Sequence, residues 1–165
     1  MNTEQCVICK LGGYSEAQPE IISSYPHLTI SPENSRELIL KCLPIGSHVG
    51  DFILDKHDNH NLLSYVFKIE EHEFRDDLLS FSILLDKKLN TEVYKFTLKE
   101  FFSDLEKKRM LSELILKQYQ KTIFDGFNLE TDIEIENYKI TLSEFFKNAK
   151  TELIKPKPKT KGSFF

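Results

Sequence analysis

Apolar and polar positions alternate with a period of two over several short segments of the chain, which predicts β-strands. The clearest is EIISSY, residues 20–25, which Pro19 and Pro26 bound at places where a missing N–H does no harm. The segment LLSFSILLD, residues 78–86, is nearly continuous in apolar residues, as expected of a central strand covered on both faces. Further strands are predicted at residues 5–11, 50–56 and 62–71.

One stretch between these strands has the period and the punctuation of a helix. In SPENSRELILKCLP, Ser31 is a good N-cap and Pro32 suits the first helical position. Leu38 and Cys42 lie on its apolar stripe, and Pro44 ends it. The order predicted so far is therefore strand, strand, helix and then three strands.

A longer helix is predicted from about Thr97 to about residue 121. Thr97 and Glu100 have the spacing of a capping box, in which each side chain satisfies a backbone N–H of the first turn. Phe96 and Phe101 have the spacing of a hydrophobic staple around the same start. This helix completes the order β-β-α-β-β-β-α and is expected to cover the sheet.

The rest of the chain predicts a small C-terminal β/α appendage and a tail. DIEIENYKI, residues 132–140, reads as a strand or a tight hairpin, and Thr141 with Glu144 repeats the capping box of a helix start. In KPKPKTKGSFF, lysines alternate with prolines, so the segment is predicted to be a disordered basic tail. We expect three parts: a main domain at residues 1–122, an appendage at 123–154 and a tail at 155–165.

Composition narrows the class of protein. The chain has 165 residues, of which 40% are hydrophobic, and this is ordinary for a globular domain with an appendage. A net charge of −4 argues against a general nucleic-acid binder. No apolar run approaches the ~18 residues of a membrane span, and the polar N-terminus does not resemble a signal peptide. We therefore predict a cytoplasmic protein, with weak peripheral membrane contact through the lysine-rich tail as an additional expectation.

The pair in CVIC, Cys6 and Cys9, has the spacing of a redox or zinc motif. On a strand, residues three apart point to opposite faces, so we expect the two thiols to be structural. The carboxylates in EEHEFRDD, residues 70–77, are interpreted as a solvated loop, because nothing apolar nearby would separate their pKa values. Neither segment predicts catalysis.

The turn DKHDNH is the best metal candidate, with Asp55, His57, Asp58 and His60. Polar residues are expected in a hairpin turn in any case, and no distant partner ligand is evident, so no metal site is predicted. The glycines of GSHVGD follow a helix and lack the lysine of a phosphate loop. We predict no cofactor and no enzymatic activity, while an enzyme using the His57 and His60 pair stays open as a third hypothesis.

With these segments in place, the sequence resembles the longin domain, in particular the divergent longin modules of the DENN family and of nitrogen-permease-regulator-like proteins. The resemblance rests on CVICKL, then PEIISSYP after a loop, then a helix ending in LKCLPIGS, then GDFIL, and it covers roughly residues 5–120. It implies an α+β fold, a five-stranded antiparallel sheet flanked by helices in the longin/profilin-like order. It also implies a role in small-GTPase regulation or vesicle trafficking. We expect neither the further domains of a DENN exchange factor nor a SNARE heptad segment after the long helix, so exchange activity is not implied.

The resemblance implies a protein-interaction platform, working as a homodimer, with another longin or roadblock domain, or with a Ras-like GTPase. Our candidate partner-binding residues are Asp51, Phe52, Ile53 and Leu54, because this short strand is flanked by turns and is the candidate edge of the sheet. The alternative interpretation of the segment is an edge blunted by its length and its aspartates. The alternative function is a small-molecule-sensing α/β domain, which requires a sizeable apolar cavity with a few polar groups directed inward.

Overall fold

The structure is a computed structural model that describes residues 2–70 and 75–154. Strands and helices follow the order β-β-α-β-β-β-α, and three helices and a hairpin come after it. The strands are β1 (Thr3–Leu11), β2 (Glu20–Tyr25), β3 (Phe52–His57), β4 (His60–Ile69), β5 (Asp77–Leu85), β6 (Ile133–Ile135) and β7 (Tyr138–Ile140). The helices are α1 (Pro32–Cys42), α2 (Thr91–Lys107), α3 (Glu113–Gln118), α4 (Gln120–Leu129) and α5 (Leu142–Ile154).

The first five strands form one antiparallel sheet in the order β2-β1-β5-β4-β3. The nearly continuous apolar strand β5 lies at its centre, as its sequence predicts. The predicted α+β class and five-stranded antiparallel sheet are thus confirmed. Strands β2 and β3 are the two edges.

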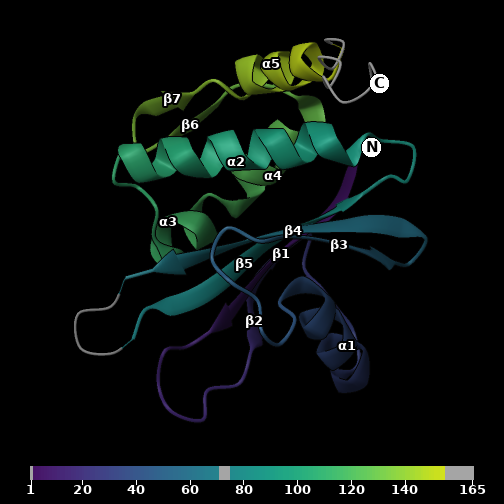
Figure 1. Cartoon of the computed structure of the whole chain (residues 1–165), viewed down its shortest axis with the longest axis vertical. Helices are drawn as coiled ribbons and strands as arrows, with labels where there is room; N and C mark the ends of the chain where they lie inside the picture. The colour runs from purple at the N-terminus through teal and green to yellow at the C-terminus, as the bar shows by residue number, and fades with distance from the viewer. Residues whose placement is uncertain (1, 71–74, 155–165) are drawn as a thin grey trace, which may run out of the picture.

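Helices cover both faces of the sheet (Figure 1). Helix α1 packs on one face, and α2, α3 and α4 lie on the other. Helix α5 packs on α2, on the side away from the sheet, together with the hairpin of β6 and β7. The two faces have separate apolar clusters, a large one beneath α2 and a smaller one beneath α1.

The large cluster is built from phenylalanines of several elements. Phe101 of α2 meets Phe127 of α4 edge to face, with ring centroids 5.5 Å apart, and Phe127 meets Phe146 of α5 at 5.7 Å. The boundary expected after residue 122 falls inside α4, whose side chains join this same core. The proposed division into parts stays a prediction, and the tail at 155–165 lies outside the described residues.

The start of α1 agrees with the sequence. Ser31 is the N-cap, and its hydroxyl accepts a hydrogen bond from the N–H of Asn34 at 3.2 Å. Pro32 occupies the first turn, where its missing N–H leaves no bond unmade.

The start predicted for the long helix is wrong. Asn90 is the N-cap of α2, accepting from the N–H of Glu92 at 3.0 Å, so the helix begins about two turns before the predicted cap at Thr97. Thr97 is buried in the middle of α2, and its hydroxyl donates to the carbonyl of Val93 at 2.8 Å. The end is also wrong, because α2 stops at Lys107 and Arg109 takes a positive φ of 56°.

The C-terminal hairpin and helix agree with the sequence. Strands β6 and β7 pair across a two-residue turn in which Glu136 and Asn137 have φ of 49° and 69°. Helix α5 begins directly after Thr141. The turn reverses the chain so that α5 returns over α2.

Candidate functional site

The candidate residues lie where the sequence places them, at an edge of the sheet. Strand β3 pairs with β4 alone and ends the strand order, and it begins at Phe52, with Asp51 directly before it. The side chain of Leu54 is 57% exposed. The edge position of these residues is therefore established, while their role in binding is a proposal.

A bulge fixes which backbone groups of β3 face outward. The carbonyl of Asp51 accepts from Val66 N–H at 2.9 Å, and Gly50 N–H donates to the carbonyl of Val66 at 2.8 Å. Gly50 has φ of 91°, so two residues of one strand oppose Val66 as in a G1 bulge. Since hydrogen bonding alternates along an antiparallel strand, Ile53 bonds to β4 while Phe52 and Leu54 turn their N–H and C=O groups outward.

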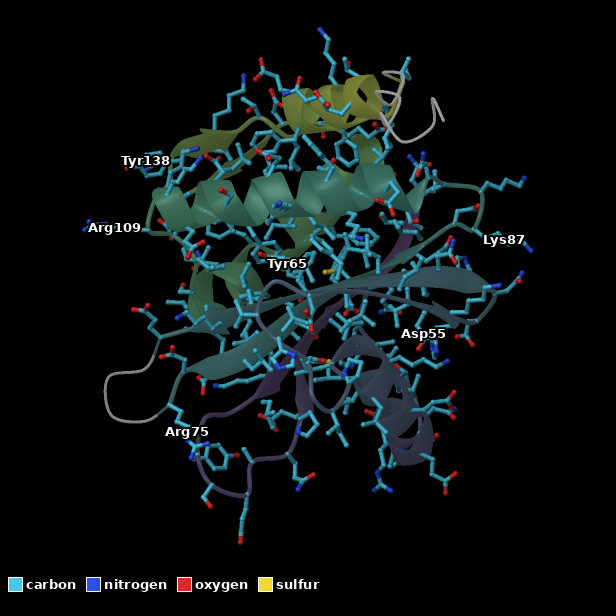
Figure 2. The ribbon with its side chains drawn as sticks, viewed as in Figure 1. Asp55, Tyr65, Arg75, Lys87, Arg109 and Tyr138 are labelled. Carbon is cyan, nitrogen blue, oxygen red and sulfur yellow. The ribbon has the colours of Figure 1, made fainter. Side chains whose placement is uncertain are left out.

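The C-terminal half of the β3 edge is capped by side chains. The outward N–H of Lys56 donates to the carboxylate of Asp55 at 2.7 Å, and its carbonyl accepts from Lys41 Nζ of α1 at 2.9 Å. Asp55 lies on the α1 side of the edge (Figure 2). Among the described residues, no such cap reaches Phe52 or Leu54. We call the segment from Phe52 to Leu54 the open half-edge.

The opposite edge of the sheet, β2, is protected in other ways. The register of β2 with β1 shifts at a bulge, and Pro19 and Pro26 flank the strand. The Ser24 hydroxyl accepts from Leu28 N–H at 3.2 Å, which binds the following loop to the strand. The bulge and the flanking prolines thus limit pairing at β2, and on the β3 side the open half-edge is the stretch that can pair with another chain.

Aromatic side chains hold Phe52 in place behind the open half-edge. Its ring lies 4.8 Å from that of Tyr65 between centroids, and Tyr65 lies 5.0 Å from Phe102 of α2. Figure 2 shows Tyr65 between the sheet and α2. Lys95 Nζ lies 5.4 Å from the centre of the Phe52 ring, a cation–π contact. Partial burial, and then the charge of Glu106, raise the pKa of Tyr65.

A surface groove of about 620 Å³ adjoins the open half-edge. One face of α2 forms its floor, Phe52 and Tyr65 form one bank, and α5 forms the other. A smaller hollow of about 40 Å³ shares Phe52 and Lys95 with it and reaches Leu54. We call the larger hollow the α2–α5 groove. Its lining residues are Gly50, Phe52, Tyr65, Glu92, Lys95, Phe96, Lys99, Ala149, Glu152 and Leu153.

The four metal candidates do not converge. His57 and His60 lie at the ends of β3 and β4, on either side of the turn at Asp58 and Asn59. His57 Nδ1 lies 3.5 Å from Lys41 Nζ, and His60 Nδ1 is 2.7 Å from the carbonyl of Asp58. Within residues 2–70 and 75–154, no group of three or more His, Cys, Asp or Glu side chains is placed to hold a metal ion.

The carboxylates of residues 70–77 are not all solvated, so this part of the loop prediction is wrong. Asp77 is only 7% exposed, accepts from Gly13 N–H at 3.0 Å and lies 3.5 Å from Lys10 Nζ. Lys10 also contacts Glu113 at 2.8 Å, which joins the sheet to α3. Glu71 and Glu73 lie outside the described residues.

The expected separation of Cys6 and Cys9 is confirmed, because they lie in clusters on opposite faces of the sheet. The structure adds a pair that the spacing did not reveal, in which Cys9 meets Cys42 at the end of α1. Contact with Cys42 and burial raise the pKa of Cys9, while the hydrogen bond from Cys9 lowers that of Cys42. Burial raises the pKa of Cys6 to about 12, and all three thiols are free and buried.

Comparisons with known proteins do not assign the chain: no family model matches it, and no curated protein matches it either. In the part of the chain that the structure describes, no helix is long and apolar enough to cross a membrane. The functional interpretation therefore depends on the fold, the open half-edge and the α2–α5 groove.

Proposed function

We propose that the chain is a non-catalytic protein-interaction platform of the longin type, acting in small-GTPase regulation or membrane trafficking. The observation that supports it most directly is the open half-edge, where two residues offer unpaired backbone groups while the rest of β3 is capped. A strand from a partner pairs with such an edge through main-chain hydrogen bonds. The candidate partners are a longin or roadblock domain, a Ras-like GTPase or a second copy of the chain.

The longin type is supported by the element order and by the sheet. The order β-β-α-β-β-β-α over β1 to α2 is the one that the resemblance implies, and EIISSY forms the strand β2 within it. The cytoplasmic location stays a prediction. Weak membrane contact also stays a prediction, since it concerns the tail at residues 155–165.

Proline substitution tests the open half-edge. Leu54→Pro removes an outward N–H that the fold does not use, and proline is tolerated on edge strands. Lys56→Pro is the matched control, because its outward N–H is already bonded to Asp55. Sedimentation velocity of the chain alone measures self-association. Capture from a lysate, with GDP-loaded or GTP-loaded Ras-like GTPases as competitors, measures binding to other partners.

We expect the wild type and Lys56→Pro either to dimerise or to capture a longin, roadblock or Ras-like partner. Leu54→Pro should do neither. Equal mass and equal capture for all three proteins would remove the open half-edge as the binding surface. Thermal unfolding of each variant controls for misfolding, since a variant that unfolds early would lose partners for an unrelated reason.

The α2–α5 groove favours a second candidate function, that of a small-molecule sensor. Its volume of about 620 Å³ lies within the range of ligand sites, and aromatic rings line it. A sensor would bind its ligand equally well in the wild type and in Leu54→Pro. Ligand-induced shifts in thermal unfolding of these two proteins, with a panel of aromatic and aliphatic metabolites, separate the two functions.

A further inference from the structure

The α2–α5 groove and the open half-edge share Phe52, and this fixes how a bound strand would meet the groove. In an antiparallel pair, directly opposite residues point to the same face of the sheet. The Phe52 side chain points to the α2 face, where it forms one bank of the groove. A partner residue opposite Phe52 therefore directs its own side chain toward the groove.

The groove fits a large uncharged side chain. Phe52, Tyr65 and Phe96 supply aromatic surface, and Ala149 and Leu153 of α5 supply the opposite bank. Large aromatic side chains are the usual anchors of interfaces, since they bury much area at a small entropic cost.

The charges around the groove also favour a neutral occupant. Two lysines and two glutamates line it, so their formal charges balance, and Lys95 is already held over the Phe52 ring. A charged side chain entering here would lose hydration without meeting an excess of opposite charge. The lining residues that carry charge are Glu92, Lys95, Lys99 and Glu152.

We propose that an extended segment of a partner protein pairs with the open half-edge and inserts one aromatic side chain into the α2–α5 groove. The inference rests on the proposed function and deepens it by naming the chemistry of the partner. It also gives the appendage a role, because α5 is the bank that turns an open face of α2 into a groove. Strand pairing provides the affinity, and the groove selects the partner.

The test uses a phage-displayed library of random nine-residue peptides, selected on the full chain. The expected result is a family of extended peptides with Phe, Tyr or Trp at one fixed position. The Kd of a synthetic peptide from that family, measured by fluorescence anisotropy, should rise at least about tenfold when the aromatic residue is replaced by Asp.

Two pairs of variants separate the edge from the groove. Lys99→Trp fills the groove from an exposed position on α2, and Lys107→Trp places the same side chain on the same helix outside it. Leu54→Pro blocks strand pairing, and Lys56→Pro is its control. The inference expects binding to be lost in Lys99→Trp and Leu54→Pro and kept in both controls.

Each other outcome overturns the inference in a distinct way. Binding lost in Leu54→Pro and kept in Lys99→Trp leaves the proposed function standing and removes the groove from it. Binding lost in Lys99→Trp and kept in Leu54→Pro identifies a side-chain or small-molecule site without strand pairing. Self-association that Lys99→Trp abolishes, with no peptide selected, makes a second copy the occupant. If no peptide is selected and the chain does not self-associate, neither the open half-edge nor the α2–α5 groove binds a protein partner.

Discussion

Lys41 of α1 donates from Nζ to the main-chain carbonyl of Lys56 on β3 at 2.9 Å. A helix on one face of the sheet thus reaches around to satisfy an outward carbonyl on its edge. Unpaired edge groups are templates for association with other chains, so this contact limits how much of β3 is available. The length of the open half-edge therefore depends on Lys41 together with Asp55, which accepts from the N–H of Lys56.

Lys41→Ala is expected to lengthen the open half-edge. The carbonyl of Lys56 would lose its partner, and pairing could then extend to this carbonyl, while the N–H of Lys56 stays bonded to Asp55. We expect more self-association at high concentration, measured by light scattering, with a change in unfolding free energy of no more than about 1 kcal/mol. Arg36→Ala, an exposed basic residue of the same helix, is the control. An unchanged scattering signal would show that Lys41 does not protect the edge.

A buried hydroxyl pair beneath α1 should behave as one unit. The Oγ atoms of Ser64 and Ser82 lie 2.6 Å apart, and both side chains are fully buried. Replacing either serine by alanine removes this hydrogen bond from the other, still buried hydroxyl, and the free energy of unfolding should fall by about 1–2 kcal/mol. The double variant removes both polar groups and should cost less than the sum of the single changes. Urea unfolding of the three variants measures this coupling, and additive costs would contradict it.

The strand positions could be predicted because each strand carries its own signal. Burial on one or both faces gives EIISSY and LLSFSILLD their patterns regardless of which strands they pair with. The start of α2 could not be read from its capping box, because Asn90 offers an earlier cap and Thr97 is satisfied within the helix by Val93. Local chemistry allowed both starts, and the short turn after β5 favours the earlier one.

The candidate site was only partly predictable for a related reason. The sequence predicts residues 51–54 as an edge because turns flank them. The cap from Lys41 and the bank formed by Leu153 arise from residues distant in the sequence, and no periodicity links them to β3. The same holds for the contact of Cys9 with Cys42, which joins β1 to the end of α1.

Gly126 of α4 should not tolerate alanine, although alanine is the better helix former. An added Cβ would lie 2.5 Å from a methyl of Ile133 and 2.8 Å from one of Leu142, and both side chains are buried. The propensity gain is about 0.5–1 kcal/mol, and overpacking costs about 1–3 kcal/mol, so we expect net destabilisation in urea unfolding. Thr122→Ala on the same helix is the control. A more stable Gly126→Ala variant would show that the hairpin and α5 can shift to make room for the added methyl group.

The carboxylate of Asp132 should hold the first turn of α5 in a pH-dependent way. Its Oδ1 accepts from the N–H of Ser143 at 3.1 Å and from the Ser143 hydroxyl at 2.6 Å. These bonds lower the pKa of Asp132, so its contribution is present above the ordinary pKa of an aspartate and is lost as the pH falls through the lower, folded-state value.

Amide hydrogen exchange across α5 measures this contribution. In the wild type, protection of the first turn should fall below about pH 4. Asp132→Ala should lack that protection at neutral pH, while Glu134→Ala, which removes a carboxylate from the same hairpin, should keep it. Because α5 is one bank of the α2–α5 groove, Asp132→Ala should also weaken the binding of a ligand in the groove, although Asp132 does not line the groove. Protection factors equal to those of the wild type would show that α5 is held by its packing on α2 alone.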